Sequence, residues 1–277
     1  MNPPRTEHQP VPAAMWRVSP RSDTAQRGKR YLPESAAHPQ RTLPDLAARI
    51  IASYSRPGDL VVDPLAGIGT ALVEAAWQDR RAIGIEICPQ WASLATANLN
   101  LARRQGAPGD GLVVQGDARH LPDLLPDGPR YRAGLITFGL PGPTVPGGLT
   151  RRARQLRRWA ASHHQPASLD RLPSGELGSA LAELLTGCAA LLRPGGAVVV
   201  HAQHARRGRN VIDLPQLTIA AARPAGLAVT ERHAVRVPRS DAKRQVIVLR
   251  RATAVASARR RPSQLSDTHR RGFRRAS

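Results

Sequence analysis

Apolar positions between residues 43 and 250 follow two periods that alternate along the chain. Spacings of three and four residues predict helices, and short apolar runs predict strands buried on both faces. The helical segments are 43–54, 70–78, 89–104, a long segment from 175, and 214–222. The apolar runs are 60–62, 82–87, 112–115, 134–138, 198–200, 227–235 and 245–249.

Strands that alternate with helices favour a mostly parallel sheet covered by helices on both faces. The last two strands are joined by a short connection, so they can pair in the antiparallel sense. The pattern therefore predicts an α/β, Rossmann-like fold with a seven-stranded, mostly parallel sheet.

The two ends of the chain lack this pattern. Residues 1–33 are rich in Pro, Arg, Gln and Ser, which predicts a disordered basic arm, and residues 252–277 predict a disordered basic tail. The folded domain is then expected over 34–251. An insertion over 143–175, between the fourth strand and the long helix, is a candidate target-binding loop.

Charge gives the first indication of a partner. The chain has 41 Lys and Arg against 20 Asp and Glu, a formal net charge of +21. This excess favours nucleic acid as partner, although the codon usage of a high-GC genome produces the same composition. Cys88 and Cys188 lie far apart in the sequence and suggest no disulfide framework, which fits a reducing cytoplasm. No apolar run is long enough for a membrane span. We therefore expect a cytoplasmic protein with no membrane partner, and the oligomeric state stays open.

Candidate binding residues follow three successive strands. Asp63 and the segment Gly67-x-Gly69-Thr70 follow the first strand, Glu86 ends the second, and Asp117 follows the third. Ligands of doubly wound folds lie at these strand ends, where glycines allow close backbone approach and a carboxylate can bind ribose hydroxyls. Together the features predict an adenosine site. Its candidate contacts are Asp63, Pro64, Ala66, Gly67, Gly69, Thr70, Glu86, Ile87, Asp117 and Ala118.

The segment Asp63–Thr70 resembles the cofactor loop of the adenine-N6 and cytosine-N4 DNA methylases and of the related tRNA guanosine N2-methyltransferases. His38-Pro39 before the first helix, the segment 80–86 and the segment 191–196 are similar to other motifs of these families. The resemblance extends from about His38 to Arg250. It implies a class I methyltransferase fold and S-adenosyl-L-methionine as cofactor, with Asp63 at the methionine end, Glu86 at the ribose and Asp117 at the adenine.

The same resemblance places the catalytic motif after the fourth strand. The family has Asp, Asn or Ser there, followed by two prolines and an aromatic residue that stacks on a flipped base. This chain has Phe138-Gly139-Leu140-Pro141 instead, so no side chain replaces the polar acceptor. Thr137, Phe138 and Pro141 are the catalytic candidates of this degenerate motif, and Phe138 is offered as a stacking residue.

Two further features lie near this position. The insertion has a basic run with one aromatic residue, typical of a surface that binds nucleic acid and equally of a solvated loop. His201 and His204 follow the fifth strand and can face the pocket, but two histidines alone rarely complete a metal site, so no metal is expected. The candidate nucleic-acid contacts are Arg151, Arg152, Arg154, Arg157, Arg158 and Trp159.

The leading hypothesis is an S-adenosyl-L-methionine-dependent enzyme that methylates an exocyclic amino group of adenine or cytosine in DNA. A tRNA guanosine N2-methyltransferase is an alternative, because the cofactor loop precedes the catalytic position as in the tRNA enzymes. A catalytically silent relative that binds the cofactor and nucleic acid is a second alternative, because the motif is degenerate. A small-molecule methyltransferase is a third.

Overall fold

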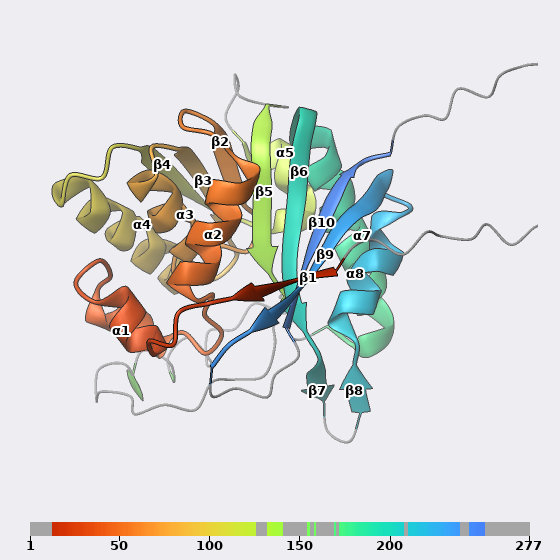
Figure 1. Ribbon diagram of the computed structural model, residues 1–277, viewed down its shortest axis with the longest axis horizontal. Helices are drawn as coiled ribbons and strands as arrows, with labels where there is room; N and C mark the ends of the chain where they lie inside the picture. Colours follow the sequence, from red (N-terminus) through yellow and green to blue (C-terminus); the bar gives the residue numbers. More distant parts are fainter. Residues whose placement is uncertain are drawn as a thin grey trace, which may run out of the picture.

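A computed structural model describes residues 13–125, 132–140, 154–155, 158, 169, 172–207, 210–238 and 244–252. Its centre is an eight-stranded sheet in the order β1-β9-β10-β6-β5-β2-β3-β4 (Figure 1). A small hairpin of β7 and β8 follows β6. The strands are β1 (Ala13–Arg17), β2 (Leu60–Asp63), β3 (Arg81–Glu86), β4 (Asp110–Gln115), β5 (Ala133–Gly139), β6 (Leu192–Gln203), β7 (Ala205–Arg207), β8 (Asn210–Ile212), β9 (Leu227–Arg236) and β10 (Arg244–Arg251).

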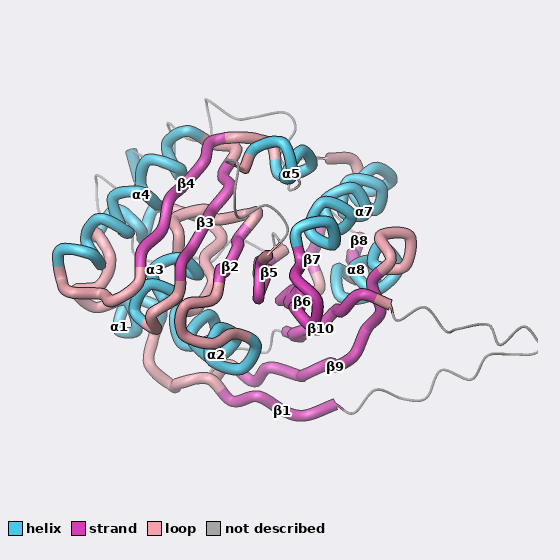
Figure 2. The backbone as a smooth tube through the Cα atoms, turned by 90° about the horizontal axis from the view of Figure 1, so that it is seen from above, coloured by secondary structure: helices cyan, strands magenta, loops and turns pink. Residues whose placement is uncertain are grey.

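Helices cover both faces of the sheet (Figure 2). On one face Leu46, Leu72 and Leu99 from three helices join the core beneath β2 and β5. On the other face Leu121, Leu184 and Leu214 close a second, larger core. The helices are α1 (Asp23–Arg27), α2 (Pro44–Tyr54), α3 (Thr70–Trp77), α4 (Pro89–Arg104), α5 (Leu121–Leu124), α7 (Ser174–Leu191) and α8 (Leu214–Ala222), with 3-10 turns η1 (Pro33–Ala37) and η2 (Ala118–His120).

The strand directions agree with the alternation read from the sequence. β6, β5, β2, β3 and β4 run parallel, and β10 pairs antiparallel with both β6 and β9. All carboxyl ends of the parallel strands therefore meet at one edge, where β6 continues into β7 (Figure 1). We call this edge the carboxyl edge; it is where a ligand site is expected.

The prediction of seven strands is wrong by one, because β1 adds an eighth strand parallel to β9. Trp16 of β1 is 6% exposed and stacks on His233, with ring centroids 4.6 Å apart. The Arg49 guanidinium lies 4.5 Å from the centroid of the Trp16 ring. Trp16 and the following Val18, also 6% exposed, therefore hold this strand against the core.

The predicted disordered arm over residues 1–33 is also wrong from Ala13 onward. Beyond β1, the segment that includes α1 and η1 packs on α3 and α4. The Tyr31 hydroxyl donates to Glu74 Oε1 at 2.7 Å, and the backbone N–H of Leu32 donates to Asn98 Oδ1 at 2.9 Å. Burial of these polar side chains with their partners satisfied is what orders a segment of low hydrophobicity.

Several predicted segments lie outside the described residues. They are residues 1–12, most of the insertion over 143–175 and the basic tail from residue 253. No helix in the described part of the chain is long and apolar enough to cross a membrane.

Candidate cofactor and catalytic site

Asp63 ends β2 and lies at the carboxyl edge in a buried position. It is 6% exposed, and its Oδ1 accepts a hydrogen bond from the backbone N–H of Leu65 at 3.0 Å. Burial raises the pKa of Asp63 to about 7; that bond opposes the rise and the nearby Glu86 carboxylate adds to it. Burial deprives this carboxylate of hydration, so a cationic group bound beside it would stabilise its charged form.

Two glycines shape the turn between β2 and α3. Gly67 has φ +55° and Gly69 has φ +78°, the left-handed region in which a Cβ is strained. A Cβ on Gly69 would also lie 3.1 Å from the Cβ of Ala95 in α4. The turn brings the N-terminus of α3 to the carboxyl edge, where free amide groups can meet a ligand.

Glu86 at the end of β3 joins this turn to the next loop. Its Oε2 accepts from the backbone N–H of Gly67 and its Oε1 from that of Cys88, each at 2.8 Å. The structure therefore brings Asp63, Gly67 and Glu86 together, as the strand-end argument predicted. A carboxylate at this strand end is suited to the hydroxyl groups of a ribose.

Asp117 lies at the next strand end, but its carboxylate is engaged locally. Arg119 donates to it from the backbone N–H at 3.0 Å and from the guanidinium at 2.5 Å. Desolvation would raise the pKa of Asp117, but the hydrogen bonds and charge of Arg119 hold it below the usual value.

Four other predicted contacts lie on the loops that follow β2, β3 and β4. Pro64, Ala66 and Ala118 are buried and Ile87 is half-buried.

The segment before α2, which carries the family-like motif of His38, lies against the same site, a contact that was not predicted from the sequence. A Cβ on Gly67 would lie 3.2 Å from His38 Nε2, so the imidazole packs against the turn between β2 and α3 (residues 64–69), which we call the cofactor turn. Arg27 of α1 was not predicted. Its Nη1 donates to Thr70 Oγ1 at 3.2 Å and its Nη2 to the carbonyl of Thr42 at 2.7 Å. The Thr70 hydroxyl is thereby bound to the protein's own N-terminal segment.

Of the catalytic candidates at the end of β5, the structure places Thr137 and Phe138 in the interior. Phe138 is 1% exposed and belongs to the core on the α7 side, so its predicted stacking role is wrong. Thr137 is 2% exposed, and Leu140 is buried in the same core as Phe138. Pro141 lies outside the described residues. Alternation along β5 explains this result, because an apolar side chain on the α7 face joins the core.

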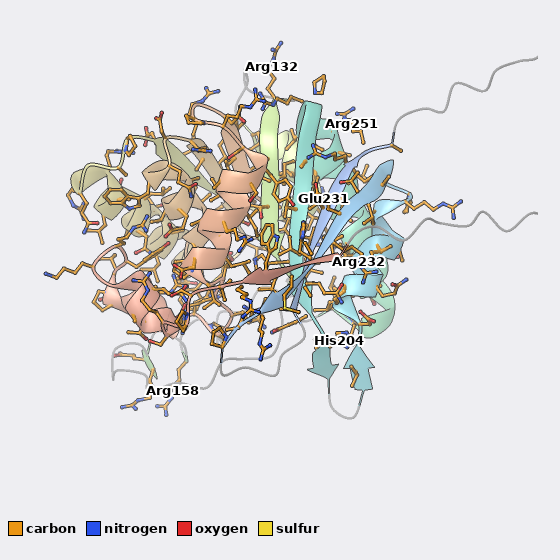
Figure 3. All side chains as sticks on the ribbon, in the orientation of Figure 1. Arg132, Arg158, His204, Glu231, Arg232 and Arg251 are labelled. Carbon is orange, nitrogen blue, oxygen red and sulfur yellow. The ribbon has the colours of Figure 1, made fainter. Side chains whose placement is uncertain are left out.

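Among the basic candidates, Arg154 and Arg158 are described and both are exposed. Figure 3 places Arg158 and His204 at the same end of the molecule, opposite Arg132. Arg132 precedes β5, so Arg158 lies at the end where that strand finishes. Arg151, Arg152, Arg157 and Trp159 lie outside the described residues. No group of three His, Cys, Asp or Glu among the described side chains could hold a metal ion.

Comparison with known proteins supports this geometry. A family model described as DNA methylase matches residues 3–97, which include the turn of Gly67 and Gly69 and Glu86. The DNA adenine methyltransferase YhdJ of Escherichia coli (strain K12) is 37% identical over 107 residues, 38% of this chain and 34% of YhdJ. The resemblance to DNA methylases is therefore confirmed for the first third of the chain, and the match to the family model ends before β5.

The structure of TrmN from Thermus thermophilus is similar with a TM-score of 0.56 and 23% sequence identity, over 81% of this chain and 53% of TrmN. The predicted fold class is confirmed: the domain has the fold of class I S-adenosyl-L-methionine-dependent methyltransferases, with β1 as an added edge strand. The chain spans about a third of the length of YhdJ and about half that of TrmN.

Proposed function

We propose that this protein is an S-adenosyl-L-methionine-dependent methyltransferase that modifies an exocyclic amino group of adenine or cytosine in DNA. The observation that carries the proposal is the joint placement of Asp63 and Glu86 around the Gly67 turn at the N-terminus of α3. The match of residues 3–97 to DNA methylases supports the same conclusion.

The residues of the turn fit the chemical groups of this cofactor. Asp63, whose pKa is raised by burial, suits the ammonium group at the methionine end, and Glu86 suits the ribose hydroxyls. The free amides at the start of α3 suit the methionine carboxylate. When bound, the cofactor would supply an electrophilic methyl group on its sulfonium sulfur.

Charge supports nucleic acid as the substrate. The formal net charge of +21 favours a polyanion, and Arg154 and Arg158 are exposed in the insertion that follows β5. Phosphate contacts of this kind position a nucleic acid without reading its sequence. The target base would then be taken out of the helix to reach the end of β5.

Methyl transfer from labelled cofactor to total DNA and to total RNA, run side by side, tests the proposal. We expect label in DNA, and loss of it in Asp63→Ala and Glu86→Ala. S-adenosylhomocysteine binding, measured by calorimetry on the same proteins, tests the site separately. Unchanged affinity in both variants would refute the site, and absence of label in DNA with normal binding would refute the reaction.

Two alternatives have specific support. A tRNA guanosine N2-methyltransferase is favoured by the order of the sites, with the cofactor turn before β5, and predicts label in RNA rather than DNA. A catalytically silent relative is favoured by the buried Phe138, because no described side chain of residues 137–140 offers a polar acceptor to a substrate. It predicts cofactor binding without label in either nucleic acid.

A further inference from the structure

His201, near the end of β6, lies directly beside Gly139, the last residue of β5. The two are register partners on parallel strands, and the backbone N–H of Leu140 donates to the His201 carbonyl at 3.0 Å. A Cβ on Gly139 would lie 2.2 Å from Cε1 and 2.6 Å from Nε2 of His201. The imidazole therefore fills the space that any larger residue at position 139 would need.

A second set of contacts connects this ring to the cofactor turn. His201 Nε2 lies 3.1 Å from the hydroxyl oxygen of Thr42. The carbonyl of Thr42 accepts from Arg27, and the same guanidinium donates to Thr70, the first residue of α3. His201 thus contacts the end of β5 and is linked through Thr42 and Arg27 to the start of α3, where the cofactor turn ends.

The ring is a hydrogen-bond acceptor at neutral pH. Burial lowers the pKa of His201 to about 3, and the positive charge of Arg244 on β10 contributes in the same direction. A neutral imidazole has one N–H and one nitrogen with a free lone pair. We assign the proton to Nε2, where it donates to Thr42 Oγ1, so that Nδ1 is the acceptor; the residue is partly exposed beside the end of β5.

We propose that His201 is the catalytic residue that accepts a hydrogen bond from the target amino group, in place of the side chain that residues 138–141 lack. This inference rests on the proposed function. The amino nitrogen forms a bond to the methyl carbon while the carbon–sulfur bond breaks and leaves its electron pair on sulfur. The excess proton of the nitrogen passes to Nδ1 and then to water. An alkylated, positively charged nitrogen is a strong acid, so a weakly basic imidazole can take this proton.

Substitutions at His201 separate the acceptor from the space that the ring fills. His201→Phe keeps the bulk of the ring without an acceptor, and we expect kcat to fall about 100-fold or more with KM for the cofactor nearly unchanged. His201→Asn places an amide oxygen close to the position of Nδ1 and should retain clearly more activity than His201→Phe. His204→Asn is the matched control, because His204 is 42% exposed and paired with Asp213.

A second pair of variants leaves the histidine intact. Gly139→Ala should displace the ring and lower kcat, whereas Gly175→Ala, with open space around it at the start of α7, should not. Gly139 has an ordinary negative or extended backbone conformation, so the substitution acts through the ring and not through φ. Thr42→Val should lower kcat by loss of the ring's orientation, and Thr42→Ser should restore it.

A direct readout does not depend on turnover. The ¹⁵N resonances of the His201 ring are recorded with S-adenosylhomocysteine, before and after addition of a mixed-sequence single-stranded DNA oligonucleotide. We expect the Nδ1 resonance to move. An active native protein whose kcat is unchanged in His201→Phe would overturn the inference and leave the proposed function intact. Absence of methyl transfer by the native protein would overturn the proposed function, and an unmoved Nδ1 resonance would independently overturn the role of His201.

Discussion

At the residue scale, Asp63 connects stability to pH. Its folded pKa of about 7 exceeds the ordinary value of 3.8, so the folded protein holds a proton that the unfolded chain releases. Stability must then fall as pH rises from about 4 to 7. We expect Asp63→Asn to remove this loss. The free energy of unfolding of the variant minus that of the wild type should therefore increase by about 3 kcal/mol from pH 5 to pH 8. Urea unfolding without cofactor measures it, and an equal difference at both pH values would contradict it.

The same carboxyl group predicts how ligand binding depends on pH. An ammonium group at the methionine end of S-adenosylhomocysteine prefers ionised Asp63, so affinity should rise as pH increases through 7 and level off above 8. Below pH 7 the gain approaches about tenfold per pH unit. Calorimetry from pH 6 to 9 measures the rise. Asp63→Asn is the control, and a rise of the same size in that variant would show that another group titrates.

Sequence alone could place some of these residues and not others. Asp63 and Glu86 were predictable because each directly follows a buried strand, and parallel strands end at one edge. His201 was also predictable as a residue at a strand end, but its contact with Thr42 was not, and Arg27 reaches the site through contacts with distant segments, which leave no local pattern. Phe138 was misjudged because the motif gives its position along the chain, whereas the face of β5 that it occupies decides its burial.

At the element scale, the start of α3 depends on the left-handed conformation of Gly69. Gly69→Ala should destabilise the fold by about 1–2 kcal/mol from the positive φ alone, with more from the contact with Ala95. It should also weaken S-adenosylhomocysteine binding at least tenfold, because the turn holds the amides of the site. Thermal unfolding and calorimetry measure the two effects.

Gly58→Ala is the matched control for this prediction. Gly58 has the same φ of +78° in the turn before β2, but nothing lies within 4 Å of its missing Cβ. The control should therefore lose stability and keep its affinity for S-adenosylhomocysteine. Equal losses of affinity in both variants would mean that backbone strain anywhere, and not the shape of the cofactor turn, governs binding.

The added strand β1 gives a prediction for the sheet edge. Trp16→Ala should lower the free energy of unfolding by about 3 kcal/mol, because the indole is buried between Arg49 and His233. Its effect on S-adenosylhomocysteine binding should stay within about twofold. Met15→Ala is the control on the same strand, since Met15 is 58% exposed, and should change stability by less than about 0.5 kcal/mol. Equal losses in both variants would contradict the anchoring role of Trp16.

At the scale of the whole molecule, the distribution of Arg predicts a dependence on salt. Double substitution Arg154→Ala and Arg158→Ala should reduce the slope of log Kd against log salt concentration for duplex DNA by up to about 2. Arg132→Ala, at the opposite end of the molecule, should leave that slope unchanged (Figure 3). Fluorescence anisotropy at several salt concentrations measures the slopes. A reduction by Arg132→Ala as large as that of the double variant would indicate charge attraction without a defined face.

The alternation of helices and strands was enough to predict the architecture of the domain, because each element shows its buried face in its own spacing. α8 was expected over 214–222 and is observed at Leu214–Ala222. The eighth strand could not be predicted in this way. Its pairing with β9 joins residues on the order of two hundred positions apart, and only the folded molecule shows that contact.

This pairing has a consequence for synthesis on the ribosome. β1 is translated long before its partner β9, and every other strand of the sheet except β10 lies between them in the chain. Until then Trp16 has neither His233 nor the sheet edge to cover it, whereas Tyr31 can already dock on Glu74 once α3 has emerged. The segment from β1 to η1 therefore assembles in two steps, and the closure of β1 onto β9 follows the synthesis of the parallel strands β2 to β6.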